Sequence, residues 1–188
     1  MNRSILACGA SLLLLSGSAL ADIVYTGTRT VGSATAELSV TTDGTIGILG
    51  TGNVLDWTIK MTEGADTFTL FGPLSGGNSQ LLVQGSALSA SLTDLMFDFD
   101  AATGLALFQS PGIGSSQTFY CVQINGCFDF SGPGEAIDPH FDFNFQRVGL
   151  QGNVVLATAV AEVPEPASLA LFGLGLAGLA ASRRRRQV

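Results

Sequence analysis

Apolar and polar side chains alternate in strict order along residues 55–62 of this 188-residue chain. The apolar positions are Leu55, Trp57, Ile59 and Met61, and the polar positions are Asp56, Thr58, Lys60 and Thr62. A period of two is typical of a β-strand with one buried face. Segments 97–100 and 141–146 alternate in the same way, and no long amphipathic helix pattern lies between Asp22 and Val163. The pattern therefore predicts an all-β fold.

Glycines separate most of these segments, which favours a single antiparallel β-sandwich, jelly-roll-like or Ig-like, with roughly eight to twelve short strands. The predicted strands are 23–31, 34–42, 45–50, 53–62, 66–71, 79–84, 88–99, 104–109, 117–123, 127–131, 141–149 and 153–161. The predicted longer loops are 72–79, 110–116 and 131–140. Asp43-Gly44 predicts a hairpin turn, because glycine readily adopts the positive φ that such turns require.

The first 21 residues have the layout of a secretory signal peptide. Arg3 gives a positive start, residues 5–15 are mostly apolar, and Ala19-Leu20-Ala21 is an Ala-x-Ala cleavage site. We therefore expect export through the secretory translocon, with a signal peptidase recognising Ala19 and Ala21 and cutting after Ala21. A lipoprotein site at Cys8 is disfavoured, because the apolar run continues beyond that residue.

The last 25 residues, 164–188, place an acid–proline motif, an apolar run over 167–181 and an arginine cluster in that order. A helix of about 15 residues at ~1.5 Å per residue covers roughly 22 Å, which is less than the ~30 Å hydrocarbon core. Three glycines lower its helix propensity further: Gly173, Gly175 and Gly178. The arginines are expected to stay on the cytoplasmic side. These features predict a short transmembrane helix. We expect it to anchor the protein only temporarily, and the alternative is a permanent anchor.

Val163 to Ser168, the apolar stretch Leu169 to Ala181 and the arginine cluster together resemble the PEP-CTERM sorting signal of Gram-negative bacteria. The resemblance implies that a membrane-embedded exosortase processes the chain, and proteins with this signal are associated with exopolysaccharide and biofilm. Carried over residue by residue, the recognition motif is Pro164, Glu165 and Pro166, and the stop-transfer cluster is Arg183, Arg184, Arg185 and Arg186. The resemblance covers about 25 of the 188 residues and implies nothing catalytic about the rest.

The body between the two signals, residues 22–163, has the size of one domain. It contains three bases, Arg29, Lys60 and Arg147, against 14 acids, which gives a net charge of −11. A body this acidic repels phosphate backbones, so nucleic-acid binding is excluded as a function class. The predicted layout is a signal peptide (1–21), a β-sandwich domain (22–163) and a sorting signal (164–188).

Two cysteines remain in the body, Cys121 and Cys127. In an oxidising exterior this even pair predicts one disulfide that closes a short loop. A zinc site is disfavoured, because two cysteines without a nearby histidine do not fill a zinc shell. A reactive thiol and unpaired thiols remain as alternatives.

The body offers few candidates for chemistry. Acids that could hold calcium with oxygen ligands gather in two places: Asp98, Asp100, Asp129, Glu135, Asp138 and Asp142. No calcium-loop motif is present, and alternating acids are also typical of a solvated strand face. A glycosidase could use Asp56 beside Trp57, but the alternation places them on opposite strand faces, with Trp57 in the core. The one histidine, His140, is disfavoured as a catalytic base, because the sequence has no Gly-x-Ser-x-Gly nucleophile elbow.

These observations predict a protein that is not an enzyme and that needs no cofactor and no metal. We expect an exported cell-surface or extracellular-matrix protein with a structural or adhesive role linked to exopolysaccharide and biofilm. Its expected partners are the exosortase-type protease, the translocon and signal peptidase, the membrane transiently, and extracellular polysaccharide. The alternative is a carbohydrate-binding module, assisted by calcium through segment 129–142, and a hydrolase comes third.

Overall fold

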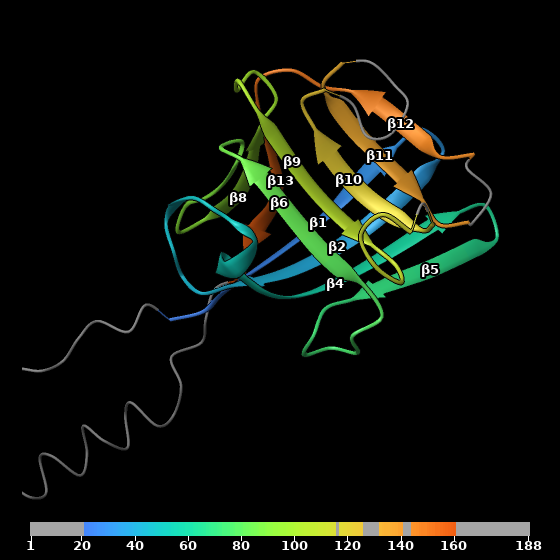
Figure 1. The fold of residues 1–188 in the computed structure, drawn as a ribbon, viewed down its shortest axis with the longest axis horizontal. Helices are drawn as coiled ribbons and strands as arrows, with labels where there is room; N and C mark the ends of the chain where they lie inside the picture. The colour runs from blue at the N-terminus through green and yellow to red at the C-terminus, as the bar shows by residue number, and fades with distance from the viewer. Residues whose placement is uncertain (1–20, 116, 126–131, 141–143, 161–188) are drawn as a thin grey trace, which may run out of the picture.

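The computed structural model describes residues 21–115, 117–125, 132–140 and 144–160. Two antiparallel sheets face each other across one hydrophobic core, which confirms the predicted all-β sandwich (Figure 1). The 8-stranded sheet has the order β3-β7-β8-β13-β1-β2-β4-β5, and the 5-stranded sheet has the order β12-β11-β10-β9-β6. Neighbouring strands in the chain often lie far apart in the sheets, so the sandwich is held together by contacts that are distant in sequence.

The strands of the larger sheet are β3 (Gly47–Ile48), β7 (Leu88–Ala90), β8 (Asp94–Asp98), β13 (Asn153–Ala159), β1 (Ile23–Val31), β2 (Ala34–Thr42), β4 (Val54–Glu63) and β5 (Asp66–Phe71). The strands of the smaller sheet are β12 (Gln146–Gly149), β11 (Gly134–Asp138), β10 (Phe119–Gln123), β9 (Gly104–Gln109) and β6 (Gln80–Gly85). One 3-10 turn, η1 (Thr51–Asn53), precedes β4.

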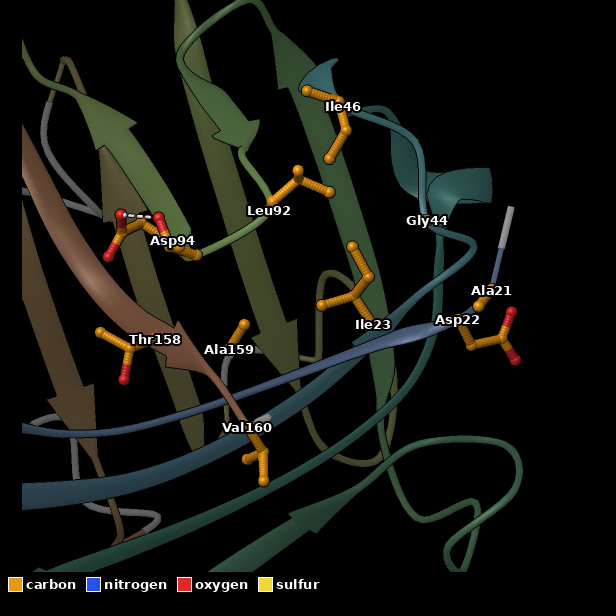
Figure 2. A pocket seen from close by; sticks show the side chains of 11 residues that line it. Ala21, Asp22, Ile23, Gly44, Ile46, Leu92, Asp94, Thr158, Ala159 and Val160 are labelled. Carbon is orange, nitrogen blue, oxygen red and sulfur yellow. Dashed lines mark hydrogen bonds between the residues drawn. The ribbon is translucent and has the colours of Figure 1, made fainter. Parts of the chain in front are cut away.

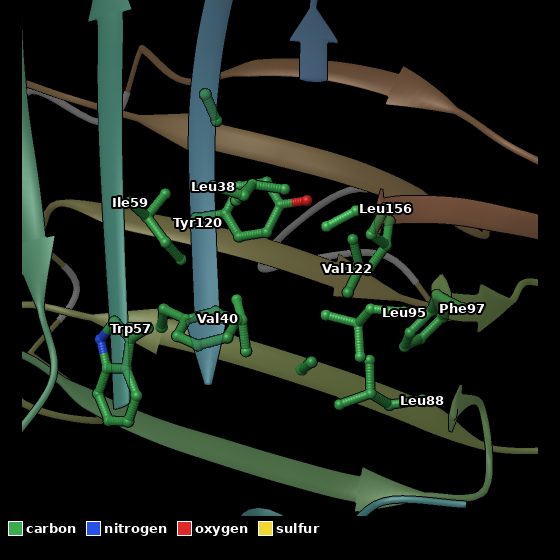
Figure 3. Packing of buried hydrophobic residues seen from close by; sticks show 14 of the residues in the cluster. Leu38, Val40, Trp57, Ile59, Leu88, Leu95, Phe97, Tyr120, Val122 and Leu156 are labelled. Atoms are coloured by element: carbon green, nitrogen blue, oxygen red, sulfur yellow. The ribbon is translucent and has the colours of Figure 1, made fainter. Parts of the chain in front are cut away.

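Side chains from both sheets fill the space between them (Figure 3). Val40 and Trp57 come from the larger sheet, and Tyr120 and Val122 come from β10 of the smaller one. Trp57 is buried as predicted, with 6% of its surface exposed. Its ring packs edge-on against Phe108 at 5.5 Å between centroids, so the alternation seen in the sequence places this tryptophan in the core.

Asp56 lies on the other face of β4 and holds the loop between β5 and β6. Its carboxylate accepts hydrogen bonds from the Leu74 backbone N–H at 3.0 Å and from the Ser75 hydroxyl at 3.2 Å. The indole N–H of Trp57 donates to the Ser79 hydroxyl at 2.9 Å. Both residues that suggested a glycosidase therefore have structural contacts on opposite faces of the strand.

The predicted strand bounds are confirmed for β1, β2, β5 and β9. The predicted strand 88–99 is two strands, because the Ser91 hydroxyl accepts hydrogen bonds from the backbone N–H groups of Thr93 and Asp94 and closes a turn. The predicted strand 45–50 is reduced to the two residues of β3. The predicted strand 127–131 lies outside the described residues.

The prediction of a loop over 131–140 is wrong, because β11 occupies Gly134–Asp138. All five of its residues are buried, and it pairs with β10 on one side and β12 on the other. Glycine, proline and two acids within this stretch suggested a loop. The acid Glu135 is accommodated inside because Arg29 and Tyr120, distant in sequence, bind its carboxylate.

The predicted hairpin around Asp43-Gly44 is also wrong. Gly44 has the expected positive φ of 78°, but β3 pairs with β7 at the edge of the sheet and not with β2. Leu49, fully buried on this segment, donates its backbone N–H to the Leu88 carbonyl. Because Leu49 is buried and bonded to Leu88, the segment after Gly44 crosses the end of the sandwich to β7 and does not return along β2.

Within the described ranges, no helix has the length and apolar composition needed to cross a bilayer. The predicted hydrophobic helix of segment 164–188 lies outside the described residues, so it stays a prediction.

Candidate functional site

The first and last strands of the sandwich lie side by side in the middle of the larger sheet (Figure 1). β1 and β13 are antiparallel, with Tyr25 opposite Ala159. The backbone N–H of Val160 donates to the Val24 carbonyl at 2.8 Å. The described chain therefore begins at Ala21 and reaches Val160 at the same end of the molecule, which we call the exit end.

A shallow hollow of about 650 Å³ opens at the exit end (Figure 2). Its lining residues are Ala21, Asp22, Ile23, Gly44, Ile46, Leu92, Thr93, Asp94, Thr158, Ala159 and Val160. Figure 2 shows Ile46, Leu92 and Ile23 pointing into a common space, from three segments that are distant in sequence. None of these lining residues is a base, and two are acids, so the hollow is apolar with an acidic component.

Three aliphatic side chains that line this hollow are exposed to solvent, and we call them the exit patch. Their exposed fractions are 49% for Ile46, 75% for Leu92 and 49% for Val160. Single exposed aliphatic residues are normal on a protein surface, but a group of them points to an interaction.

Hydrogen bonds hold the exit patch in place. Leu92 stands at the tip of the Ser91 turn, where the Ser91 backbone N–H also donates to the Asp94 carbonyl at 2.8 Å. The loop that carries Ile46 is closed by the Asp43 carboxylate. Hydrogen bonds from the Asn53 side chain and the Thr45 backbone N–H hold the pKa of Asp43 below its ordinary value. The aliphatic side chains are therefore presented by fixed loops.

Sequence reasoning did not find the exit patch. An alternating strand over 88–99 would bury Leu92 on the same face as Leu88 and Ala90, and a regular strand over 45–50 would pair Ile46 within a sheet. The patch exists because the strand order brings the loop before β3, the turn before β8 and the end of β13 together. No local pattern in the sequence encodes that juxtaposition.

His140 lies at the opposite end of β1, between two carboxylates. Its Nε2 is 3.0 Å from Asp66 Oδ2, and its Nδ1 is 3.6 Å from Glu63 Oε2. The Ser33 hydroxyl donates to Glu63 Oε1 at 2.8 Å instead of bonding to the imidazole. These four side chains join the turn after β1, the β4–β5 hairpin and the end of β11, which is a structural arrangement.

Glu135 lies in a buried cluster that links the two sheets. Its carboxylate accepts hydrogen bonds from the Arg29 guanidinium at 2.8 Å and 3.1 Å, and from the Tyr120 hydroxyl at 2.6 Å. Burial, followed by the charge of Glu135, raises the pKa of Tyr120 well above its ordinary value. Burial alone would lower the pKa of Arg29, but its bonds to Glu135 raise it. The cluster consists of matched charges and has no exposed carboxylate.

The acids considered for calcium are not gathered in one place among the described residues. Asp98 accepts from the Asp100 backbone N–H and Asp100 from that of Gly152, which are turn contacts. Asp138 is buried and accepts from the His140 backbone N–H. Asp129 and Asp142 lie outside the described residues. In the part of the chain that the structure describes, no three His, Cys, Asp or Glu side chains form a metal-binding group.

Cys121 is buried on β10, opposite Ala136 of β11, and its sulfur is in a disulfide. Cys127 lies outside the described residues, so the pairing of Cys121 with Cys127 stays a prediction. Of the predicted signal-cleavage residues, Ala21 lies exposed at the exit end and Ala19 is outside the described ranges. β1 begins two residues after Ala21, at Ile23.

The segment that follows the exit end matches a known protein family. Residues 162–186 match the family described as the PEP-CTERM protein-sorting motif. The chain carries a PEP-CTERM motif. The matched range contains the predicted recognition residues Pro164 to Pro166 and the arginines Arg183 to Arg186. No curated protein and no solved structure matches the chain.

The PEP-CTERM motif implies an exported protein with a membrane-anchored precursor, and an exosortase as its processing partner. The motif begins two residues after Val160, where the described chain leaves the sandwich. The exit end is therefore the part of the domain next to the sorting signal.

Proposed function

We propose that the chain is a surface or matrix protein whose sandwich has a structural or adhesive role in the extracellular polysaccharide layer and performs no catalysis. Its signal peptide directs it through the translocon, its tail anchors it briefly, and the exosortase cuts the tail. The observation that carries this proposal is the PEP-CTERM motif at residues 162–186, directly after the last strand.

The polar side chains of the sandwich support a structural role. Glu135 and Asp138, two acids considered for calcium-assisted sugar binding, are buried and hydrogen-bonded within the fold. His140, the one histidine, is placed between Glu63 and Asp66, and Asp56 holds a loop. These groups fix the two sheets and their connections. We therefore prefer a structural role over the carbohydrate-binding module.

Mass spectrometry of the protein released by native cells tests this function. We expect an N-terminus at Asp22, a C-terminus that lacks Arg183 to Arg186, and Cys121 linked to Cys127. Cells without the exosortase should retain the arginines. Intact arginines in protein recovered outside wild-type cells would contradict the processing step.

A pair of variants tests recognition. Glu165→Ala, within the Pro-Glu-Pro motif, should leave the tail uncut. Glu162→Ala changes an acid of the matched range that lies outside the Pro-Glu-Pro tripeptide, so it is the matched control and should be processed like the wild type. Equal processing of both variants would show that the Pro-Glu-Pro glutamate is not recognised.

A further inference from the structure

The exit patch lies next to the point where the chain leaves for its anchor. Val160 is itself part of the patch, and residues 161–166 separate it from the apolar run that begins at residue 167. A fully extended chain spans at most ~3.3–3.6 Å per residue, so the seven residue steps from Val160 to residue 167 cover at most about 25 Å. While the tail is in the bilayer, the exit end must stay close to the lipid headgroups.

The side chains of the exit end favour an apolar contact with lipid over an electrostatic attraction to charged headgroups. Ile46, Leu92 and Val160 offer aliphatic side chains, and no base lines the hollow. Asp94 lies in the same lining and repels anionic headgroups, whereas the α-ammonium that signal cleavage creates at Asp22 offsets the Asp22 carboxylate. The contact must therefore depend on apolar burial and on the tether, which raises the local concentration of the patch at the surface.

We propose that the exit patch rests in the headgroup region of the bilayer while the precursor is anchored, and that it leaves the membrane when the tail is cut. This inference rests on the proposed function, because it requires the anchored precursor. Three aliphatic side chains bind lipid weakly without a tether, so removal of the tail ends the contact. In the docked state the Pro164–Pro166 motif is held against the membrane surface, where a membrane-embedded protease reaches it.

Depth-dependent quenching in vesicles tests the contact. The purified chain without its signal peptide, residues 22–188, which lacks Cys8, is reconstituted into phosphatidylcholine vesicles that contain lipids brominated near the headgroup. An environment-sensitive fluorophore is attached through Leu92→Cys at the exit end. In a second sample it is attached through Ala65→Cys, on the exposed β4–β5 hairpin at the opposite end of the sandwich. Labelling is carried out without reductant, because Cys121 is in a disulfide.

We expect several-fold stronger quenching at position 92 than at position 65. Ile46→Ser with Val160→Ser, in the Leu92→Cys background, should remove most of that difference, whereas Leu74→Ser should not. Leu74 is the matched control because it is an exposed leucine on the β5–β6 loop, with 79% of its surface exposed. Anionic lipid should weaken the quenching, since Asp94 opposes it.

Several results would overturn the proposal. Equal quenching at both positions would show that the exit end does not face the lipid. A blue shift at position 92 without lipid quenching would show that protein covers the patch. A blue shift that grows with the protein density in the vesicles would then indicate a second copy. A blue shift independent of density would indicate the connection 161–166 of the same chain. If the chain does not float with the vesicles, its tail does not anchor it in the bilayer, and the proposal is wrong. The vesicle experiment contains no exosortase, so its outcome is distinguishable from a failure of the processing step in cells.

Discussion

The buried cluster around Glu135 and the exit patch reverse the usual placement of charge and apolar surface. In the cluster, Arg29, Tyr120 and Glu135 lie between the sheets, with the carboxylate fully buried. In the patch, aliphatic side chains such as Leu92 are held out into solvent by fixed turns. The interior charges have all their partners within the fold, whereas the exposed aliphatic groups have theirs outside it. The Glu135 cluster therefore stabilises the fold, and the exit patch is the surface that we propose contacts the bilayer.

Removal of the carboxylate from the cluster should have the largest effect. Glu135→Leu leaves Arg29 partly buried without its counter-charge, which costs about 3–5 kcal/mol for a buried pair. Urea denaturation followed by the fluorescence of Trp57, the one tryptophan, measures the loss. The triple variant Arg29→Met/Tyr120→Phe/Glu135→Leu should recover most of it, because apolar groups then replace both charges and no buried hydroxyl loses its acceptor.

The exposed pair Lys60–Glu37 gives the matched control for that comparison. Its atoms are 3.5 Å apart, and both side chains are about half exposed or more, at 48% and 63%. Glu37→Leu should change the free energy of unfolding by less than about 1 kcal/mol, as is typical for surface pairs. An equal loss for Glu37→Leu and Glu135→Leu would show that burial of the cluster does not matter.

Tyr120→Phe should have an intermediate effect, of about 1–3 kcal/mol, because it removes one donor from a buried carboxylate. The tyrosine hydroxyl is 2.6 Å from Glu135 Oε1, and the ring remains in the core. Denaturation at neutral pH measures the loss. No change would indicate that water or another side chain replaces the hydroxyl.

The same tyrosine should make the protein less stable at alkaline pH. Burial raises the pKa of Tyr120, and also that of Tyr25, so the folded state keeps protons that the unfolded state releases. The stability is fully present below the ordinary tyrosine pKa of about 10, and it falls by up to ~1.4 kcal/mol per group per pH unit above it. Denaturation between pH 8 and 11 should show a shallower fall for Tyr120→Phe, with Tyr25 still contributing. If stability falls equally steeply with pH in the wild type and in Tyr120→Phe, the alkaline loss does not come from Tyr120.

Substitutions in the exit patch should have the smallest effect on stability. Leu92→Ser should change the free energy of unfolding by no more than about 0.5 kcal/mol, because an exposed side chain loses little burial. The same denaturation assay measures it. A loss as large as that of Tyr120→Phe would place Leu92 among the residues that hold the fold and would end the contrast between the two regions.

Much of the sandwich is predictable from residues that alternate within one segment, and less from residues that meet across the fold. The bounds of β1, β2, β5 and β9 follow from local periodicity and glycine positions. β11 does not, because the burial of Glu135 depends on Arg29, more than a hundred residues earlier in the chain. The sorting motif is contiguous, so sequence alone finds it. The exit patch depends on strand order, which no local pattern determines.

The adjacency of β1 and β13 also determines when the domain can be completed. The middle of the larger sheet forms from the first and the last strand, so its closure needs nearly the whole chain on one side of the membrane. Pairings of such large sequence separation form slowly, because the intervening chain must be ordered first. The chain should consequently cross the translocon before it is able to fold, which keeps it competent for export until its tail reaches the bilayer.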